Sequence, residues 1–238
     1  MAPDYPFGIF KLFLFIIDMT ADITVLQQTY NGQLKVLCRA TGDDCGGTSV
    51  DDRLCNMLEE IVGKKVTTES KRKDPMHWLD MLHDFRHKMK WFTKHFFLKY
   101  PPSLNEIGEE LHGKHLKSVI KSSSYVNEIT LVTDKLKFKA DLIIKLVTPT
   151  IDSIIILMKN IVSNLSTNGV SNNVSNIVVV GGLSEFHMIQ DAVYKAFPDN
   201  RIIISDNADL SVLLGALLFG HRPDYIWSEL RDEEGIGK

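Results

Sequence analysis

The chain has 238 residues, of which 44% are hydrophobic and 24% are charged, so it can bury one large core or two smaller ones. Its formal net charge of -3 argues against a protein that binds nucleic acid over its whole surface, and we expect no nucleic-acid partner. The three cysteines cannot all pair within one chain and form no C-x-x-C motif. This pattern indicates neither a disulfide framework nor a zinc knuckle, and it favours a reducing, cytoplasmic setting.

An apolar run near the N-terminus, at residues 10–17, has some features of a signal or membrane segment. It is too short to span a bilayer, contains Lys11, ends at Asp18 and has no small-residue cleavage site. We therefore predict a buried strand here and expect no membrane partner.

Three strands are expected to open the chain as a β-meander, at residues 12–17, 23–30 and 33–41. The Asn31-Gly32 pair between the last two is a strong signal for a two-residue hairpin turn. A glycine-containing stretch, GDDCGG at 42–47, then precedes a helix from about Ser49, with Asp51 and Asp52 in its first turn.

The middle of the chain is expected to be mainly helical. Asp74-Pro75 suits the start of a long helix, and Pro101-Pro102 suits its end. The expected elements are a helix to about residue 99, mostly helical structure over 104–121, two short strands within 128–138, a helix over 140–147, a separate helix from Pro149 to about residue 164, and a loop over 163–176.

The last third alternates strands and helices. The apolar run at 177–180 is typical of a strand buried in a parallel sheet, and helix 184–197, strand 201–204 and helix 209–219 are expected after it. The sequence therefore predicts an α/β protein with a β-meander, helices, and a strand-helix-strand-helix part.

The junction NIVVVGGLSE, at 176–185, is the clearest candidate for a binding site. A strand that ends in Gly181 and Gly182 lets the backbone approach a ligand closely. The following helical turn offers N–H groups to polar or anionic atoms. The same pattern also serves as a plain turn, so the junction alone does not decide between these roles.

Four blocks, taken together, resemble the ATPase domain of the heat shock 70 kDa protein family, and especially its divergent subgroup 12. They are DITVLQQTYNGQLKVLCRATGDDCGGTSVDDRL, PTIDSII, IVVVGGLSEFHMIQDAVYKAF and LLGALLFGHRP. The resemblance covers residues 16–223 and implies the second lobe of an actin-like, ribonuclease H-like ATPase domain. It implies a lobe over residues 10–225, a helical insertion at about 64–140 and a tail at 226–238, in a truncated relative without the first lobe.

The resemblance also implies a nucleotide site for ATP or ADP with Mg²⁺, with cofactor-binding residues at Asp18, Thr20, Lys90, Gly181 and Gly182. In the family, the paired glycines lie against the adenosine side of ATP, and glycine-rich hairpins surround the phosphates.

Two departures from the family pattern weaken the expected site. The second phosphate hairpin of the family has three consecutive glycines that the stretch from Asp18 to Thr24 lacks. The Glu-x-x-Lys-Arg pattern that reaches adenine and ribose falls on Arg86, Met89 and Lys90, of which Lys90 alone keeps a comparable charge. We therefore expect weak or absent ATP hydrolysis and no catalytic residues. The alternative is a non-catalytic interaction or regulatory module that kept the fold and lost the nucleotide.

A basic segment, a histidine pair and one cysteine each have both a functional and a purely structural interpretation. Residues 64–99 carry ten Lys or Arg against four acids, with Trp78, Trp91 and Phe92 interleaved, which would suit RNA or an acidic partner. The helical spacing of Trp78, Leu82, Phe85, Met89 and Phe92 favours packing into the core instead. His83 and His87 have the i, i+4 spacing of a metal pair, yet no third ligand is evident, so a solvated helix face is expected. Cys45 is expected to be a partly exposed turn residue without a catalytic role.

Overall fold

The computed structural model describes residues 9–16, 20–28, 34–43, 45–92, 94–167, 174–205 and 210–221. The expected Asn31-Gly32 turn, the candidate residue Asp18 and the expected tail lie outside these residues. Within them, the mixed α/β class is confirmed.

A five-stranded sheet combines the two ends of the chain. Strands β1 (Ile9–Ile16), β2 (Thr20–Gln28) and β3 (Leu34–Asp43) pair antiparallel as the expected meander. Strand β7 (Val174–Val180) pairs parallel with β1, and β8 (Arg201–Ile204) pairs parallel with β7. The strand order is β3-β2-β1-β7-β8.

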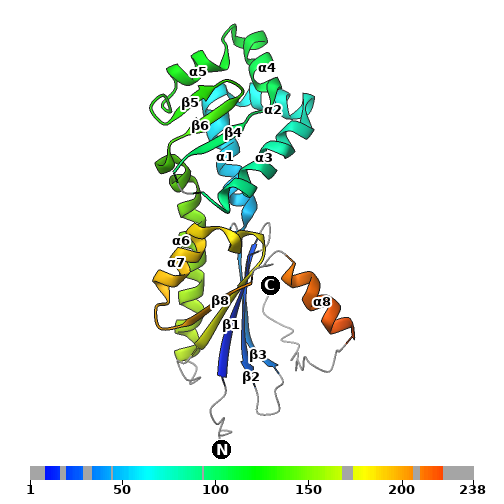
Figure 1. The fold of residues 1–238 in the computed structure, drawn as a ribbon, viewed down its shortest axis with the longest axis vertical. Coiled ribbons are helices and arrows are strands. Elements are labelled where there is room, and N and C mark those ends of the chain that lie inside the picture. Colours follow the sequence, from blue (N-terminus) through cyan, green and yellow to red (C-terminus); the bar gives the residue numbers. More distant parts are fainter. Residues whose placement is uncertain are drawn as a thin grey trace, which may run out of the picture.

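Helices α6 (Ala140–Thr167) and α7 (His187–Ala196) lie to one side of this sheet (Figure 1). Alternation along β2 accounts for the packing, because Ala21, Ile23 and Val25 are buried while the residues between them are half-buried. Ile177 and Val179 of β7 are buried in the same way. We call this part, residues 9–43 and 174–221, the sheet body.

The second part, residues 47–138, is the helical body at the top of Figure 1. It has a three-stranded antiparallel sheet in the order β4-β6-β5. Phe85, Phe96 and Phe138 pack edge to face in its core, with ring centroids 5.3 and 5.9 Å apart. Its elements are α1 (Gly47–Val62), α2 (Lys64–Lys73), α3 (Pro75–Met89), β4 (Phe96–Lys99), α4 (Pro102–His112), α5 (Leu116–Ser122), β5 (Ile129–Val132) and β6 (Lys135–Phe138).

The expectation of one helix from Asp74 to about Lys99 was wrong, since α3 ends at Met89 and β4 follows. Phe96 and Leu98 are buried, whereas the residue between them is half-buried and Lys99 is exposed. This two-residue period fits a strand, and pairing with β6 satisfies its backbone groups.

Helix α6 runs without interruption through Pro149, although two separate helices were expected. Proline removes one backbone donor, but Leu146 and Ile154 on either side are both buried, so tertiary packing maintains one helix. The helix continues to Thr167 and therefore also replaces the beginning of the expected loop. Its lower half covers the sheet body and its upper end joins the helical body (Figure 1).

The expected helix 184–197 is divided in two. A single 3₁₀ turn, η1 (Gly182–Glu185), precedes α7, which begins at His187. Strand β8 has the predicted bounds, and the last predicted helix is α8 (Ser211–His221). In the described residues, none of the helices has both the length and the apolar character needed to cross a membrane.

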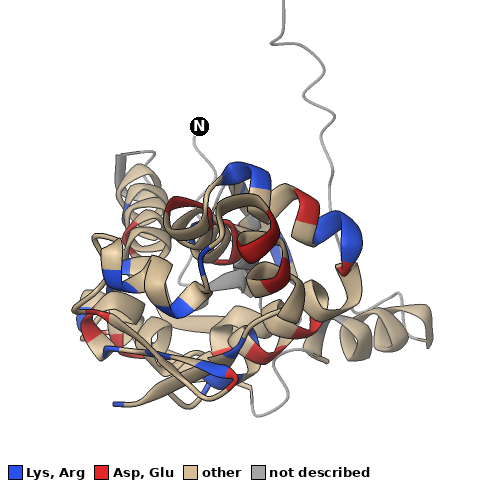
Figure 2. Ribbon diagram, turned by 90° about the horizontal axis from the view of Figure 1, so that it is seen from above, with Lys and Arg blue, Asp and Glu red and all other residues tan. Residues whose placement is uncertain are grey.

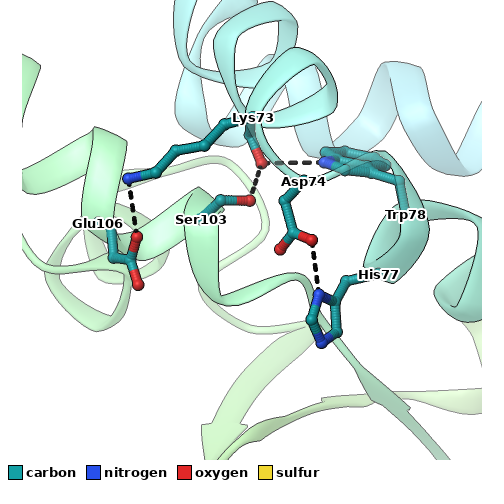
Figure 3. Close-up of polar contacts among 7 residues, drawn as sticks. Lys73, Asp74, His77, Trp78, Ser103 and Glu106 are labelled. Carbon is teal, nitrogen blue, oxygen red and sulfur yellow. Dashed lines mark hydrogen bonds and ion pairs between the residues drawn. The ribbon is translucent and has the colours of Figure 1, made fainter.

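A buried polar network joins three helices of the helical body. The Trp78 indole N–H donates to the Ser70 hydroxyl at 2.9 Å, and the Ser70 and Ser103 hydroxyls lie 2.6 Å apart. Figure 3 shows Trp78 and Ser103 beside two surface pairs, Lys73 with Glu106 and Asp74 with His77. All three members of the network are buried, so each hydrogen bond replaces one that water would otherwise make.

We expect Ser70→Ala to lower the free energy of unfolding by about 1–3 kcal/mol, because it leaves the Trp78 N–H and the Ser103 hydroxyl without this partner. Urea denaturation of the purified protein measures the change. The control is Ser153→Ala, at an exposed position on α6, which should change stability by less than about 0.5 kcal/mol. Equal stability of the two variants would contradict the structural role of the network.

Gly42, near the end of β3, allows helix α6 to approach closely. A Cβ atom at this position would lie 2.7 Å from Leu157 Cδ2 and 2.9 Å from Cys45 Sγ. We expect Gly42→Ala to destabilise the protein by about 1–3 kcal/mol through overpacking. In thermal denaturation, Gly215→Ala should be neutral or stabilising, because a Cβ there meets nothing within 4 Å and alanine favours a helix.

Candidate functional site

The two glycines that follow β7 occupy positions with different structural requirements. Gly181 has a φ of 97°, in the region that favours glycine. Its carbonyl accepts hydrogen bonds from the Ser184 backbone N–H at 3.0 Å and from the Ser184 hydroxyl at 2.6 Å. A Cβ atom on Gly182 would meet nothing within 4 Å, so open space adjoins this residue. The junction is thus a fixed turn with one open side.

A cavity of about 170 Å³ lies between the end of α3 and this turn. It brings together two of the predicted site residues, Lys90 and Gly182, which are far apart in the sequence. Gly181 immediately precedes Gly182 in the same turn. The lining consists of His83, Arg86, His87, Lys90, Gly182, Leu183 and Phe186.

Lys90 forms an ion pair with Glu185, the last residue of η1. The two side chains retain 27% and 19% of their exposure, so the pair is largely shielded from water. Sequence reasoning included Glu185 in a family block but gave it no role. The pair depends on how α3 and η1 are placed in three dimensions, and no local pattern predicts that.

The two departures from the family pattern on α3 have structural explanations. The Arg86 guanidinium donates from Nε and Nη2 to Oδ2 of Asp51, at 2.9 and 2.5 Å. Asp51 is buried in α1, which begins at Gly47, so this acid lies beyond the first turn in which it was expected. Met89 is buried in the core. Arg86 therefore serves the packing of α1 against α3, and Met89 does not reach the cavity.

Two other predicted site residues, Asp18 and Thr20, are not among the described residues that line this cavity. Asp18 lies outside the described residues. Thr20 begins β2 opposite Asp43 of β3, and its side chain is not among those described. Near it, the Thr41 hydroxyl donates to Asp22 at 2.7 Å.

The histidines of α3 take different positions. His77 contacts Asp74 at 2.5 Å, and this hydrogen bond lowers the pKa of the Asp74 carboxyl. His83 and His87 line the cavity. Over the part of the chain that the structure describes, no three His, Cys, Asp or Glu side chains are grouped closely enough to hold a metal ion.

The basic residues of the segment 64–99 alternate with acids on the surface. Arg72 pairs with Glu69 at 2.8 Å and Lys73 with Glu106 at 3.0 Å. Figure 2 shows Lys and Arg interspersed with Asp and Glu over the helical body. Within the same segment, Trp78, Phe85 and Met89 are buried and Leu82 and Phe92 are partly buried, so the predicted inward packing is confirmed. Trp91, in contrast, is 70% exposed.

The cysteines offer no activated nucleophile. Cys45 is buried, which corrects the expectation of partial exposure, because the glycine-containing loop folds its side chain against Gly42. Burial raises the pKa of the Cys38 and Cys55 thiols, so both have less thiolate at neutral pH than an ordinary cysteine.

The cavity therefore combines a guanidinium, an ammonium and two imidazoles with the backbone of a glycine turn. All of these groups can donate hydrogen bonds, and the guanidinium and the ammonium carry positive charge, as a polar or anionic ligand requires. No carboxylate is among the residues that line it.

Comparison with known proteins gives matches over most of the chain. The chain is 30% identical over 213 residues to heat shock 70 kDa protein 12A of Homo sapiens, and 30% identical over 213 residues to its Mus musculus counterpart. It is 26% identical over 215 residues to heat shock 70 kDa protein 12B of Homo sapiens. Each match covers 87% of this chain and 31% of the relative. No protein-family model matches the chain.

We expect Arg86→Met to destabilise the protein by about 3–5 kcal/mol, because it leaves the buried Asp51 carboxylate without its cation. In the double variant Asp51→Leu and Arg86→Met, an apolar pair should recover most of this loss. Urea denaturation of both variants measures the difference. A single variant as stable as the wild type would indicate that Arg86 is available to a ligand instead.

Proposed function

The chain is a relative of the heat shock 70 kDa proteins 12A and 12B, and we propose that it is the second lobe of an actin-like, ribonuclease H-like ATPase domain. In this proposal it binds ATP or ADP weakly and hydrolyses ATP little or not at all. The chain spans 31% of the length of these relatives, so their whole-protein activities are not transferred to it.

The sheet topology supports the proposed lobe. The meander and the strand-helix-strand part contribute to one sheet, although the whole helical body separates them in the sequence. Helices and a small sheet occupy the region of the expected insertion at 64–140.

The observation that carries the proposed nucleotide site is the cavity beside the glycine turn. The sequence predicts Lys90 and Gly182 as cofactor-binding residues, and both line it. The donors around the cavity suit the ribose hydroxyls or phosphates of a nucleotide. Mg²⁺ prefers oxygen ligands, and the described lining has no carboxylate, so the cavity fits the nucleotide better than the metal.

Weak or absent hydrolysis follows from the sequence of the stretch that corresponds to the family's second phosphate hairpin. Phosphoryl transfer depends on amides and metal ions positioned around the γ-phosphate. The stretch from Asp18 to Thr24 lacks the three glycines that shape such a bend in the family.

A second candidate function is a non-catalytic interaction module that has lost the nucleotide. It is favoured by the roles of Arg86 and Met89, which pack α1 against α3 and fill the core. The small volume of the cavity also favours it, because ligand sites commonly occupy about 300–1,000 Å³.

Calorimetric titration with ADP at high protein concentration separates the two candidates. We expect weak binding by the wild type. Gly182→Val adds methyl groups beside the cavity and should weaken ADP binding about tenfold or more, equivalent to ~1.4 kcal/mol. Gly220→Val, on α8, is the matched control because a Cβ there also meets nothing within 4 Å.

One result would contradict nucleotide binding, and another would contradict the proposed absence of ATP hydrolysis. No ADP heat from the wild type would favour the interaction module. ATP turnover that is lost on Asp18→Asn would contradict the proposed lack of hydrolysis.

A further inference from the structure

The Lys90–Glu185 ion pair joins the two bodies of the molecule. Lys90 caps the C-terminal end of α3 in the helical body, and Glu185 ends η1 in the sheet body. Lys90 lines the cavity, as do Gly182, Leu183 and Phe186 on either side of Glu185. The pair therefore crosses from one wall of the cavity to the other.

A second contact crosses between the same two segments. The rings of Trp91 and His187 lie with centroids 5.5 Å apart, in a tilted arrangement. Each of these residues is one or two positions from a member of the ion pair. Other links between the bodies are the covalent connections where β3 leads into α1 and where α6 leads back toward the sheet, and α6 packs against both α1 and α7. The ion pair and the ring contact add side-chain links between the end of α3 and the segment that contains η1 and the start of α7.

The small volume of the cavity connects the ion pair to ligand binding. At about 170 Å³ it is smaller than the ~300–1,000 Å³ of typical small-molecule sites. Full enclosure of a nucleotide between the two walls requires them to separate. Because Lys90 lines one wall and Glu185 lies in the turn whose neighbouring residues line the other, that separation stretches or breaks their ion pair.

We propose that the Lys90–Glu185 ion pair is a clasp that holds this cavity closed, and that Glu185 thereby sets the affinity for a nucleoside diphosphate or triphosphate. The choice of ligand rests on the proposed function above. An anionic ligand that uses Lys90 has to displace the Glu185 carboxylate, so ligand and clasp compete for one ammonium group.

Glu185→Gln is the direct test, since it keeps the size of the side chain and removes its charge. If the clasp keeps the cavity closed about nine-tenths of the time, breaking it raises the competent fraction and strengthens ADP binding about tenfold. Calorimetric titration with ADP measures the affinity. Hydrogen–deuterium exchange of segments 86–92 and 182–190, without nucleotide, measures opening and should be faster in this variant.

The charge-swapped double variant, Lys90→Glu with Glu185→Lys, is the matched control. It restores an ion pair of opposite direction, so exchange in both segments should return toward the wild-type rate. Thermal denaturation of each variant verifies that the fold is intact.

The two readouts separate this proposal from the nucleotide function. Unchanged exchange in Glu185→Gln would overturn the clasp, whatever the affinity for ADP. Faster exchange in Glu185→Gln that the charge swap reverses would support the clasp. If neither the wild type nor Glu185→Gln then bound ADP, the clasp would be supported and the proposed nucleotide function would fail.

Discussion

The parallel pairing of β1 with β7 is the constraint on which the rest of the molecule depends. Parallel neighbours cannot be joined by a tight turn, and a crossover of a dozen or more residues must connect them. Here the connection includes the rest of the meander, the whole helical body and α6. The pairing therefore fixes where the helical body leaves the sheet and where α6 returns to it. It also places Gly181 at the end of the strand paired with β1.

The site between the bodies shows how stability and binding compete for the same charged groups. Arg86 satisfies the buried Asp51, and Lys90 pairs with Glu185. Both cations lie at the cavity, yet each already has an acidic partner. A ligand there gains only the difference between its own contacts and those it replaces, which is consistent with a weak site.

The sequence predicted those parts of the fold in which one local signal dominates. The strands expected at 177–180 and 201–204 and the two short strands expected within 128–138 are found in β7, β8, β5 and β6. The prediction failed at Pro149, where buried neighbours outweighed a local helix breaker, and after Met89, where pairing with β6 selected a strand. For the site, the glycine turn and Lys90 were available from the family blocks. Glu185 was missed because its partner lies on a distant helix.

The unbroken course of α6 has a mechanical consequence. A helix of 28 residues is about 42 Å long, and this one reaches from the junction with the helical body to the far end of the sheet. Pro149 withholds one backbone donor from its ladder, in the third turn, and the Thr150 hydroxyl next to it accepts from Arg53 of α1 at 2.5 Å. The helix therefore lacks one backbone hydrogen bond close to the point where Arg53 links it to α1. A small bend at this point would rotate one body about the other, without sliding their faces past each other.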